Sequence, residues 1–165
     1  VSMRDLAQAL EIKAASLYNH INSKQEILGI IILDVAENFT QHMNSVSPEN
    51  ISSIKKLESV IENHIQITIE KTDALACLNN DWMHLEKLDL ENYLMMRNTY
   101  EAKMRNIIEQ GIQQKELQER NIDLVLFSLL STLRTLHLWD SKNKEVSPQL
   151  LFEEMKQNLL HGIIR

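Results

Sequence analysis

The residues best suited to a chemical task lie close to the start of the chain, at helical spacing. Short or hydrogen-bonding side chains are expected to share one outward face, and they are Lys13, Ala14, Ser16, Asn19 and His20. Small residues allow a helix to come close to base edges in the major groove, and the methyl groups of Ala14 and Ala15 could contact thymine. This pattern indicates DNA recognition rather than catalysis.

Two short helices are needed to position these side chains. Ser2 and Asp5 form a capping-box pattern, which predicts a helix to about Leu10, and a second apolar pattern predicts another helix that ends near His20. The side chains expected to face inward are Leu6, Leu10, Ile12, Leu17 and Ile21. Two short helices joined by a tight turn are typical of a helix-turn-helix.

A longer helix is predicted directly after this pair. Ser23 and Glu26 form a second capping-box pattern, and the apolar spacing behind them continues to about Met43. The polar stretch 44–50 then interrupts the pattern. We therefore place a domain boundary there, with a DNA-binding domain at 1–44 and a second domain at 45–165.

Residues 2–28 resemble the DNA-binding domain of the TetR family of bacterial transcriptional regulators, most closely in the segment SLYNHINSK at residues 16–24. The resemblance implies a homodimeric repressor that binds a palindromic operator and releases it when a small molecule binds. It places Arg4, Lys13, Ala14, Ala15, Ser16 and Asn19 at base edges. It places Ser2, Tyr18, His20 and Lys24 on DNA phosphates, although Tyr18 could instead be a core residue and His20 a solvated helix end.

The sequence departs from this family in two places. Glu11 stands where the family usually has glycine, so a positive φ there would cost on the order of 1 kcal/mol. The family's domain also has an earlier helix, which would precede Val1, and we expect residues upstream of Val1 to be missing.

Composition favours an all-α protein, and the length allows either one core or a small module joined to a larger helical body. The 165 residues include only 3 Gly and 2 Pro, which are too few to form the turns between many short strands. Beyond the boundary, apolar spacing predicts helices at about 51–71, 74–80, 90–114, 122–139 and 150–164. The net charge is -6, and all of it belongs to residues 34–165, because the charges of residues 1–33 cancel. We interpret the acidic part as a solvated surface.

The cysteine content and the apolar runs indicate the cellular compartment. Cys77 is the single cysteine, which excludes an internal disulfide and fits a reducing cytoplasm. No apolar run is judged to approach the roughly 18 residues of a membrane span, so no membrane partner is expected.

The last two predicted helices are too apolar to face water on all sides. The resemblance implies that they pair with a second copy of the chain as a four-helix interface, although a monomer core is the alternative. The side chains assigned to this interface are Leu126, Leu133, Leu151, Phe152, Met155, Leu159 and Ile163.

A ligand pocket is expected among the long helices, where methionine and aromatic side chains suit an elongated apolar effector. The candidates are Trp82, Met83, Tyr93, Met96, Tyr100, Met104, Phe127, Leu130 and Arg134, and plain core packing remains open for each. Arg134 needs an anion, either a ligand group or a neighbouring glutamate. No cofactor is expected.

The stretch 93–117 is similar to a TetR-family branch that controls lipid breakdown and responds to acyl-CoA thioesters. It departs from that branch at Lys115, which replaces a glycine, and between Arg134 and His137. An acyl-CoA or a fatty-acid-like molecule is therefore one hypothesis for the effector.

Two other functions are the alternatives to a DNA-binding regulator. Asp81, His84, Glu86 and His64 could bind a metal, but their spacing matches no known metal motif, and no nucleophile elbow or phosphate loop is present, so no enzyme is expected. The second is an adaptor that keeps the helical body without binding DNA.

Overall fold

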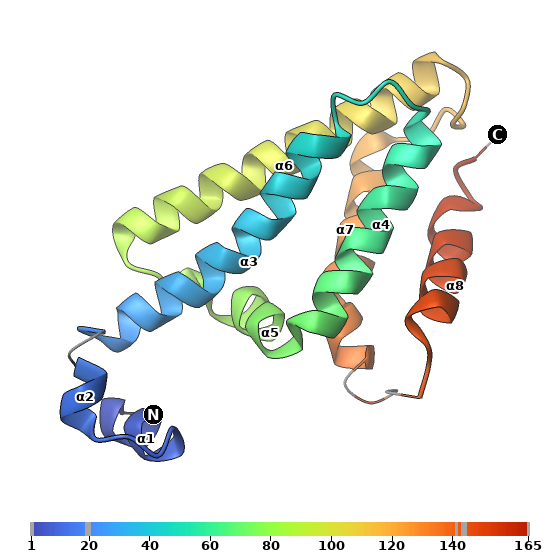
Figure 1. Cartoon of the computed structure of the whole chain (residues 1–165). Helices are drawn as coiled ribbons and strands as arrows, with labels where there is room; N and C mark the ends of the chain where they lie inside the picture. The colour runs from blue at the N-terminus through green and yellow to red at the C-terminus, as the bar shows by residue number, and fades with distance from the viewer. Residues whose placement is uncertain (1, 19–20, 141, 143–144, 165) are drawn as a thin grey trace.

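The computed structural model describes residues 2–18, 21–140, 142 and 145–164, and these form an all-α protein (Figure 1). In chain order the helices are α1 (Met3–Ala9), α2 (Ala14–Tyr18), α3 (Lys24–Val46), α4 (Ser53–Glu70), α5 (Thr72–Asp81), the 3-10 turn η1 (Trp82–His84), α6 (Lys87–Gln113), α7 (Ile122–Asp140) and α8 (Pro148–Leu160). We call α1 and α2 the head and α3 to α8 the body. The predicted fold class is confirmed.

Helix starts follow the expected capping chemistry. Ser2 Oγ accepts a hydrogen bond from the Asp5 amide at 3.2 Å, and Asp5 Oδ2 accepts one from the Ser2 amide at 2.6 Å. Ser23 Oγ accepts from the Glu26 amide at 3.1 Å. The carboxylate of Glu26, however, accepts from Asn22 rather than from the cap residue. Each cap satisfies amides that have no partner inside their helix.

The long helix α3 connects the head to the body. Figure 1 shows it leaving the head and running alongside α6. Its residues Ile32, Val35 and Met43 are completely buried in the body. The helix continues to Val46, so by packing it belongs to both regions that the sequence separated at residue 44.

Most of the apolar interior lies in the body. One cluster joins the C-terminal half of α3 to α4, α6, α7 and α8, and a second joins α3 to α4, α5 and α6. The head holds a small cluster around Met3, Ala7 and Leu17. The expectation that Leu10 and Ile12 face inward was wrong, because they are 61% and 41% exposed. They follow the last turn of α1, where the chain changes direction.

The expectation that no apolar segment approaches the length of a membrane span was wrong for α7. Its 19 residues are apolar and long enough to cross a bilayer, judged by length and composition alone. One face, which includes Leu129 and Leu133, is buried in the body. The other face carries Ser128, Thr132 and Thr135 among its apolar residues. A core helix with one partly polar face passes the same test.

Candidate DNA-binding face and ligand cavity

The head presents most of its predicted DNA contacts to solvent. Ser2, which caps α1, and Arg4 on α1 are exposed, and Lys24 is exposed at the start of α3. On and just before α2, Lys13, Ala15 and Ser16 are exposed, Ala14 is half-buried and Tyr18 is 50% exposed. Asn19 and His20 lie outside the described residues. The described candidates thus lie on the surface. The exposure of Tyr18 does not support the alternative in which this residue belongs to the core.

Leu17 fixes the orientation of α2. It is buried against Met3 and Ala7 of α1, and this contact turns the opposite side of the short helix outward. Glu11 adopts a φ of 56° between the two helices, which is the strained conformation considered for this position from the sequence. The amide of Ile12 donates to the carbonyl of Ala7 at 3.0 Å, which closes the first helix at this left-handed residue.

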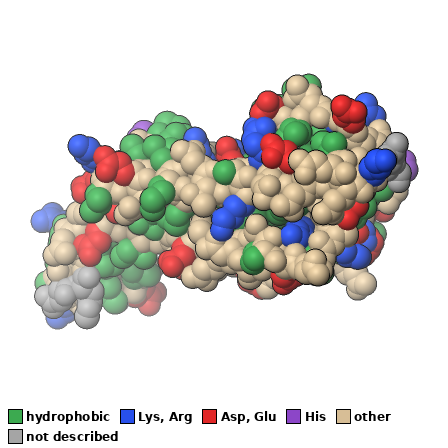
Figure 2. Space-filling model, turned by 90° about the horizontal axis from the view of Figure 1, so that it is seen from above, with side chains coloured by type: hydrophobic (Ala, Val, Ile, Leu, Met, Phe, Trp, Pro, Cys, Tyr) green, Lys and Arg blue, Asp and Glu red, His purple; other side chains and the backbone are tan. Residues whose placement is uncertain are grey.

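Charge is distributed evenly over the surface seen from above. Figure 2 shows acidic and basic side chains interspersed, with apolar side chains gathering toward the end that holds the head. No group of three or more metal-ligating side chains occurs among the described residues. The metal alternative therefore has no geometric support in that part of the chain.

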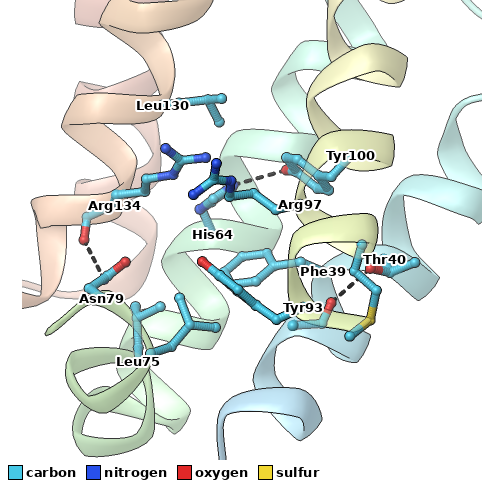
Figure 3. A pocket seen from close by; sticks show the side chains of 13 residues that line it. Phe39, Thr40, His64, Leu75, Asn79, Tyr93, Arg97, Tyr100, Leu130 and Arg134 are labelled. Carbon is cyan, nitrogen blue, oxygen red and sulfur yellow. Dashed lines mark hydrogen bonds between the residues drawn. The ribbon is translucent and has the colours of Figure 1, made fainter. Parts of the chain in front are cut away.

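A cavity of about 60 Å³ lies in the body where five helices meet. Figure 3 shows aromatic, aliphatic and cationic side chains pointing into it. The residues that line it are Ala36, Phe39 and Thr40 of α3, His64 of α4, Leu75, Leu78 and Asn79 of α5, Tyr93, Met96, Arg97 and Tyr100 of α6, and Leu130 and Arg134 of α7. Every α-helix of the body except α8 thus contributes to one site.

Arg134 has a protein partner. Its guanidinium donates to Glu101 Oε1 at 2.5 Å, and its backbone carbonyl accepts from Asn79 Nδ2 at 2.8 Å. Of the two anions that the sequence left open, the structure therefore provides the glutamate. Arg134 and Glu101 remain 42% and 32% exposed, so solvent weakens the attraction between them.

A neutral hydrogen-bonded pair forms another part of the wall. His64 Nε2 and the Tyr100 hydroxyl lie 2.9 Å apart, and both residues are buried. Burial, followed by the positive charge of Arg134, lowers the pKa of His64 to about 3. Burial also raises the pKa of the Tyr100 phenol. Both side chains are uncharged at neutral pH and act as hydrogen-bonding groups.

The structure brings together five of the nine residues predicted for the pocket: Tyr93, Met96, Tyr100, Leu130 and Arg134. The other four lie elsewhere. Met104 is buried in the core, Met83 and Phe127 are 57% and 68% exposed, and Trp82 packs on Tyr93 outside the lining. Arg97 was missed, although its spacing from Tyr93 and Tyr100 places it on the same face of α6.

The predicted dimer residues divide in a similar way. Leu126, Leu133 and Leu151 are buried within one chain, so the structure does not offer them to a partner. Phe152, Met155, Leu159 and Ile163 are half-buried. The exposed apolar side chains on these two helices are Leu124, Phe127, Leu138, Trp139 and Leu150. The sequence pattern located the helices but not which face is free.

A groove lies between α7 and α8. Leu124, Ser128 and Leu159 line one part of it, and Thr135, Trp139 and Leu150 line another. The small hydroxyl residues leave room for another helix to approach α7 closely.

Comparisons with known proteins agree with this architecture. Residues 50–163 match the family model described as the tetracyclin repressor-like C-terminal domain. No curated protein matches the chain by sequence.

Several solved structures share the fold, among them the following three. A TetR-family transcriptional regulator, PfmR of Thermus thermophilus, has a TM-score of 0.87 at 23% identity, with 100% of this chain and 90% of that chain covered. The ketosteroid transcriptional regulator KstR2 of Mycobacterium tuberculosis gives 0.87 at 15% identity, with 100% and 85% covered. AibR in complex with isovaleryl coenzyme A and operator DNA gives 0.81 at 17% identity, with 96% and 86% covered.

A helix-turn-helix joined by one long helix to a helical body with an internal cavity defines the class of ligand-binding transcriptional regulators. The family match covers more than half of the chain. The chain belongs to the TetR family of transcriptional regulators, which are not enzymes.

Proposed function

We propose that this protein is a cytoplasmic repressor that binds a palindromic operator as a homodimer and leaves it when a small, largely apolar effector occupies the cavity. The observation that carries the proposal is the course of α3. It begins at Lys24 beside the head and contributes Phe39 and Thr40 to the cavity wall. One helix therefore runs from the head to the cavity and could transmit a change between the two sites.

The size of the cavity supports a mechanism for release. Drug-sized ligands occupy sites of roughly 300 to 1,000 Å³, whereas this cavity measures about 60 Å³. An effector must therefore move the surrounding helices apart. Displacement of α3 relative to α6 would reorient both heads of a dimer and change the distance between their DNA-contacting helices.

The DNA contacts assigned to the head follow their exposure and chemistry. We assign Lys24, Ser2 and Tyr18, which are exposed, to DNA phosphates, and the exposed residues of α2 to base edges. The related architecture of AibR, whose structure contains both operator DNA and isovaleryl coenzyme A, supports a regulator of this kind. An acyl-CoA or a fatty-acid-like effector stays a hypothesis.

Fluorescence anisotropy of the full chain with DNA from its own promoter, at two salt concentrations, tests the DNA-binding part. Lys24→Ala should weaken binding to all sequences and lower the salt slope by about one. Lys55→Ala is the matched control, because Lys55 is an exposed lysine of the body. No salt-dependent binding by the wild-type chain would contradict the proposal and favour an adaptor.

The homodimer is proposed to form through the outward faces of α7 and α8. Phe127→Asp places a charge on a side chain that is 68% exposed in the single chain. Light scattering at micromolar concentration should then show the mass of a monomer, where the wild type shows a dimer. Leu88→Asp, at a position 69% exposed on α6, should leave the dimer intact. A monomeric wild type would refute this interface.

A further inference from the structure

Arg97 differs from the other polar residues of the cavity because nothing in the described chain satisfies its inner nitrogen. Its Nε is buried, and no described group accepts a hydrogen bond from it. The guanidinium carbon lies 5.2 Å from the centre of the Trp82 ring, and Trp82 packs on Tyr93 with ring centres 5.6 Å apart. Aromatic contacts and a hydrogen bond to the Tyr93 phenol hold this cation in place, whereas an acceptor for the Nε–H group is missing.

The charges at the cavity do not balance. Arg97 and Arg134 point toward one another in Figure 3, and both act on the Tyr93 phenol. The acidic group that acts on the same phenol is Glu101, which is bound to Arg134. His64 is neutral at neutral pH because its pKa is about 3. One positive charge is therefore left over in a partly desolvated site, where an unpaired charge is costly.

Much of the remaining wall is apolar. Phe39, Leu75, Leu78 and Leu130 line the cavity together with the two arginines. A surplus of one charge matches a carboxylate, which carries a single negative charge, better than a phosphate monoester, which carries about −1.5 to −2 near pH 7. Arginine also binds carboxylates through two parallel hydrogen bonds.

We propose that the effector is an amphipathic monocarboxylate and that Arg97 binds its carboxylate while its apolar part fills the cavity. The inference rests on the proposed function, because it assumes that this cavity is the effector site. Arg134 keeps its bond to Glu101 and orients the charged end of the ligand without neutralising it. Arg97 is thus the residue that selects a charged ligand over a neutral one of equal size.

Isothermal titration calorimetry of the full chain without DNA at pH 7 tests this assignment. The probes are octanoate and 4-phenylbutanoate, each compared with the alcohol of the same carbon skeleton. Each carboxylate should bind at least tenfold more tightly than its alcohol. Arg97→Gln should remove at least tenfold of carboxylate affinity and leave the alcohols unchanged, and Arg97→Lys should retain part of it.

Arg105→Gln is the matched control, because Arg105 lies on the same helix and pairs with Asp123 on the surface, away from the cavity. It should bind both carboxylates like the wild type. Thermal melting of Arg97→Gln checks the fold, and an unchanged or higher melting temperature is expected because an uncompensated charge is removed.

Three results would overturn the inference: equal affinity for carboxylate and alcohol, carboxylate binding that survives Arg97→Gln, or binding of octanoyl-CoA without binding of octanoate. The same samples are titrated with operator DNA. Retained DNA binding together with absent carboxylate selectivity would refute this inference alone, whereas absent DNA binding by the wild type would refute the proposed function.

Discussion

The head and the body bury apolar surface on different scales. In the described residues, the head's interior is built on Met3, Ala7 and Leu17, whereas two clusters of buried side chains fill the body. Helix α3 is shared, since its first turn follows the head and its middle lies in the body core. The difference teaches that the head depends on local contacts and is the less stable unit, while the body is the scaffold that holds it.

The largest effect should come from the body core. Leu133 is completely buried, so Leu133→Ala should lower the free energy of unfolding by about 3 to 5 kcal/mol through lost contacts and a cavity. Urea unfolding measures it, and the exposed Leu88→Ala should change stability by less than about 0.5 kcal/mol. If Leu133→Ala destabilised only the head, the body would not be the scaffold that holds the head.

Truncation of the head core should act locally. Leu17→Ala should destabilise the head by about 2 to 3 kcal/mol, abolish operator binding and speed amide exchange in residues 3–18. The urea midpoint of the body should stay close to that of the wild type. Leu10→Ala, at a position 61% exposed, is the control. Cooperative loss of both regions would show that they unfold as one unit.

Acid should weaken the body through His64. Burial depresses its pKa to about 3 from the ordinary 6.5, so the unfolded chain binds more protons as the pH falls below 6.5. Between pH 7 and pH 5 this group should reduce the free energy of unfolding by about 2 kcal/mol. His64→Gln should lose that share of the pH dependence, and the exposed His84→Gln should not. Identical pH slopes for wild type and His64→Gln would contradict it.

The smallest effects concern two left-handed residues, one in each region. Glu11 and Lys115 have φ values of 56° and 63°. Replacement by glycine relieves the strain that the side chain causes at positive φ, which should raise the free energy of unfolding by about 0.5 to 1 kcal/mol. The greater entropy of glycine in the unfolded chain subtracts from this gain. Glu11→Gly should protect the head amides from exchange, and Lys115→Gly should raise the urea midpoint of the body. If Glu11→Gly stabilised the body, or Lys115→Gly the head, the two regions would not be independent in stability.

The sequence located the head well because its signals are local. Ser2 and Asp5 lie within one helical turn of each other, and Glu11 lies shortly after the end of α1. Helical spacing separates Leu17, which faces inward, from Ser16, which faces outward. Leu10 and Ile12 were misplaced because the sequence pattern gives apolar character but not the path of the chain after the helix ends.

The cavity was located only in part. Tyr93 and Tyr100 share a face of α6, which periodicity reveals, but the same rule gives no ground for separating Met104, a core residue, from Met96, a cavity residue. Arg97 shares this face of α6 by its spacing, but only the structure shows that Trp82 lies beside it.

The sequence alone determined the helix positions, the caps and the resemblance of residues 2–28, because each depends on neighbours within a few residues. Which faces of α7 are buried, which helices enclose the cavity and which arginine has a partner were decided by the tertiary structure. The physical reason is that Arg134 and Glu101 are joined across two helices, and such contacts follow from packing angles that no local pattern contains.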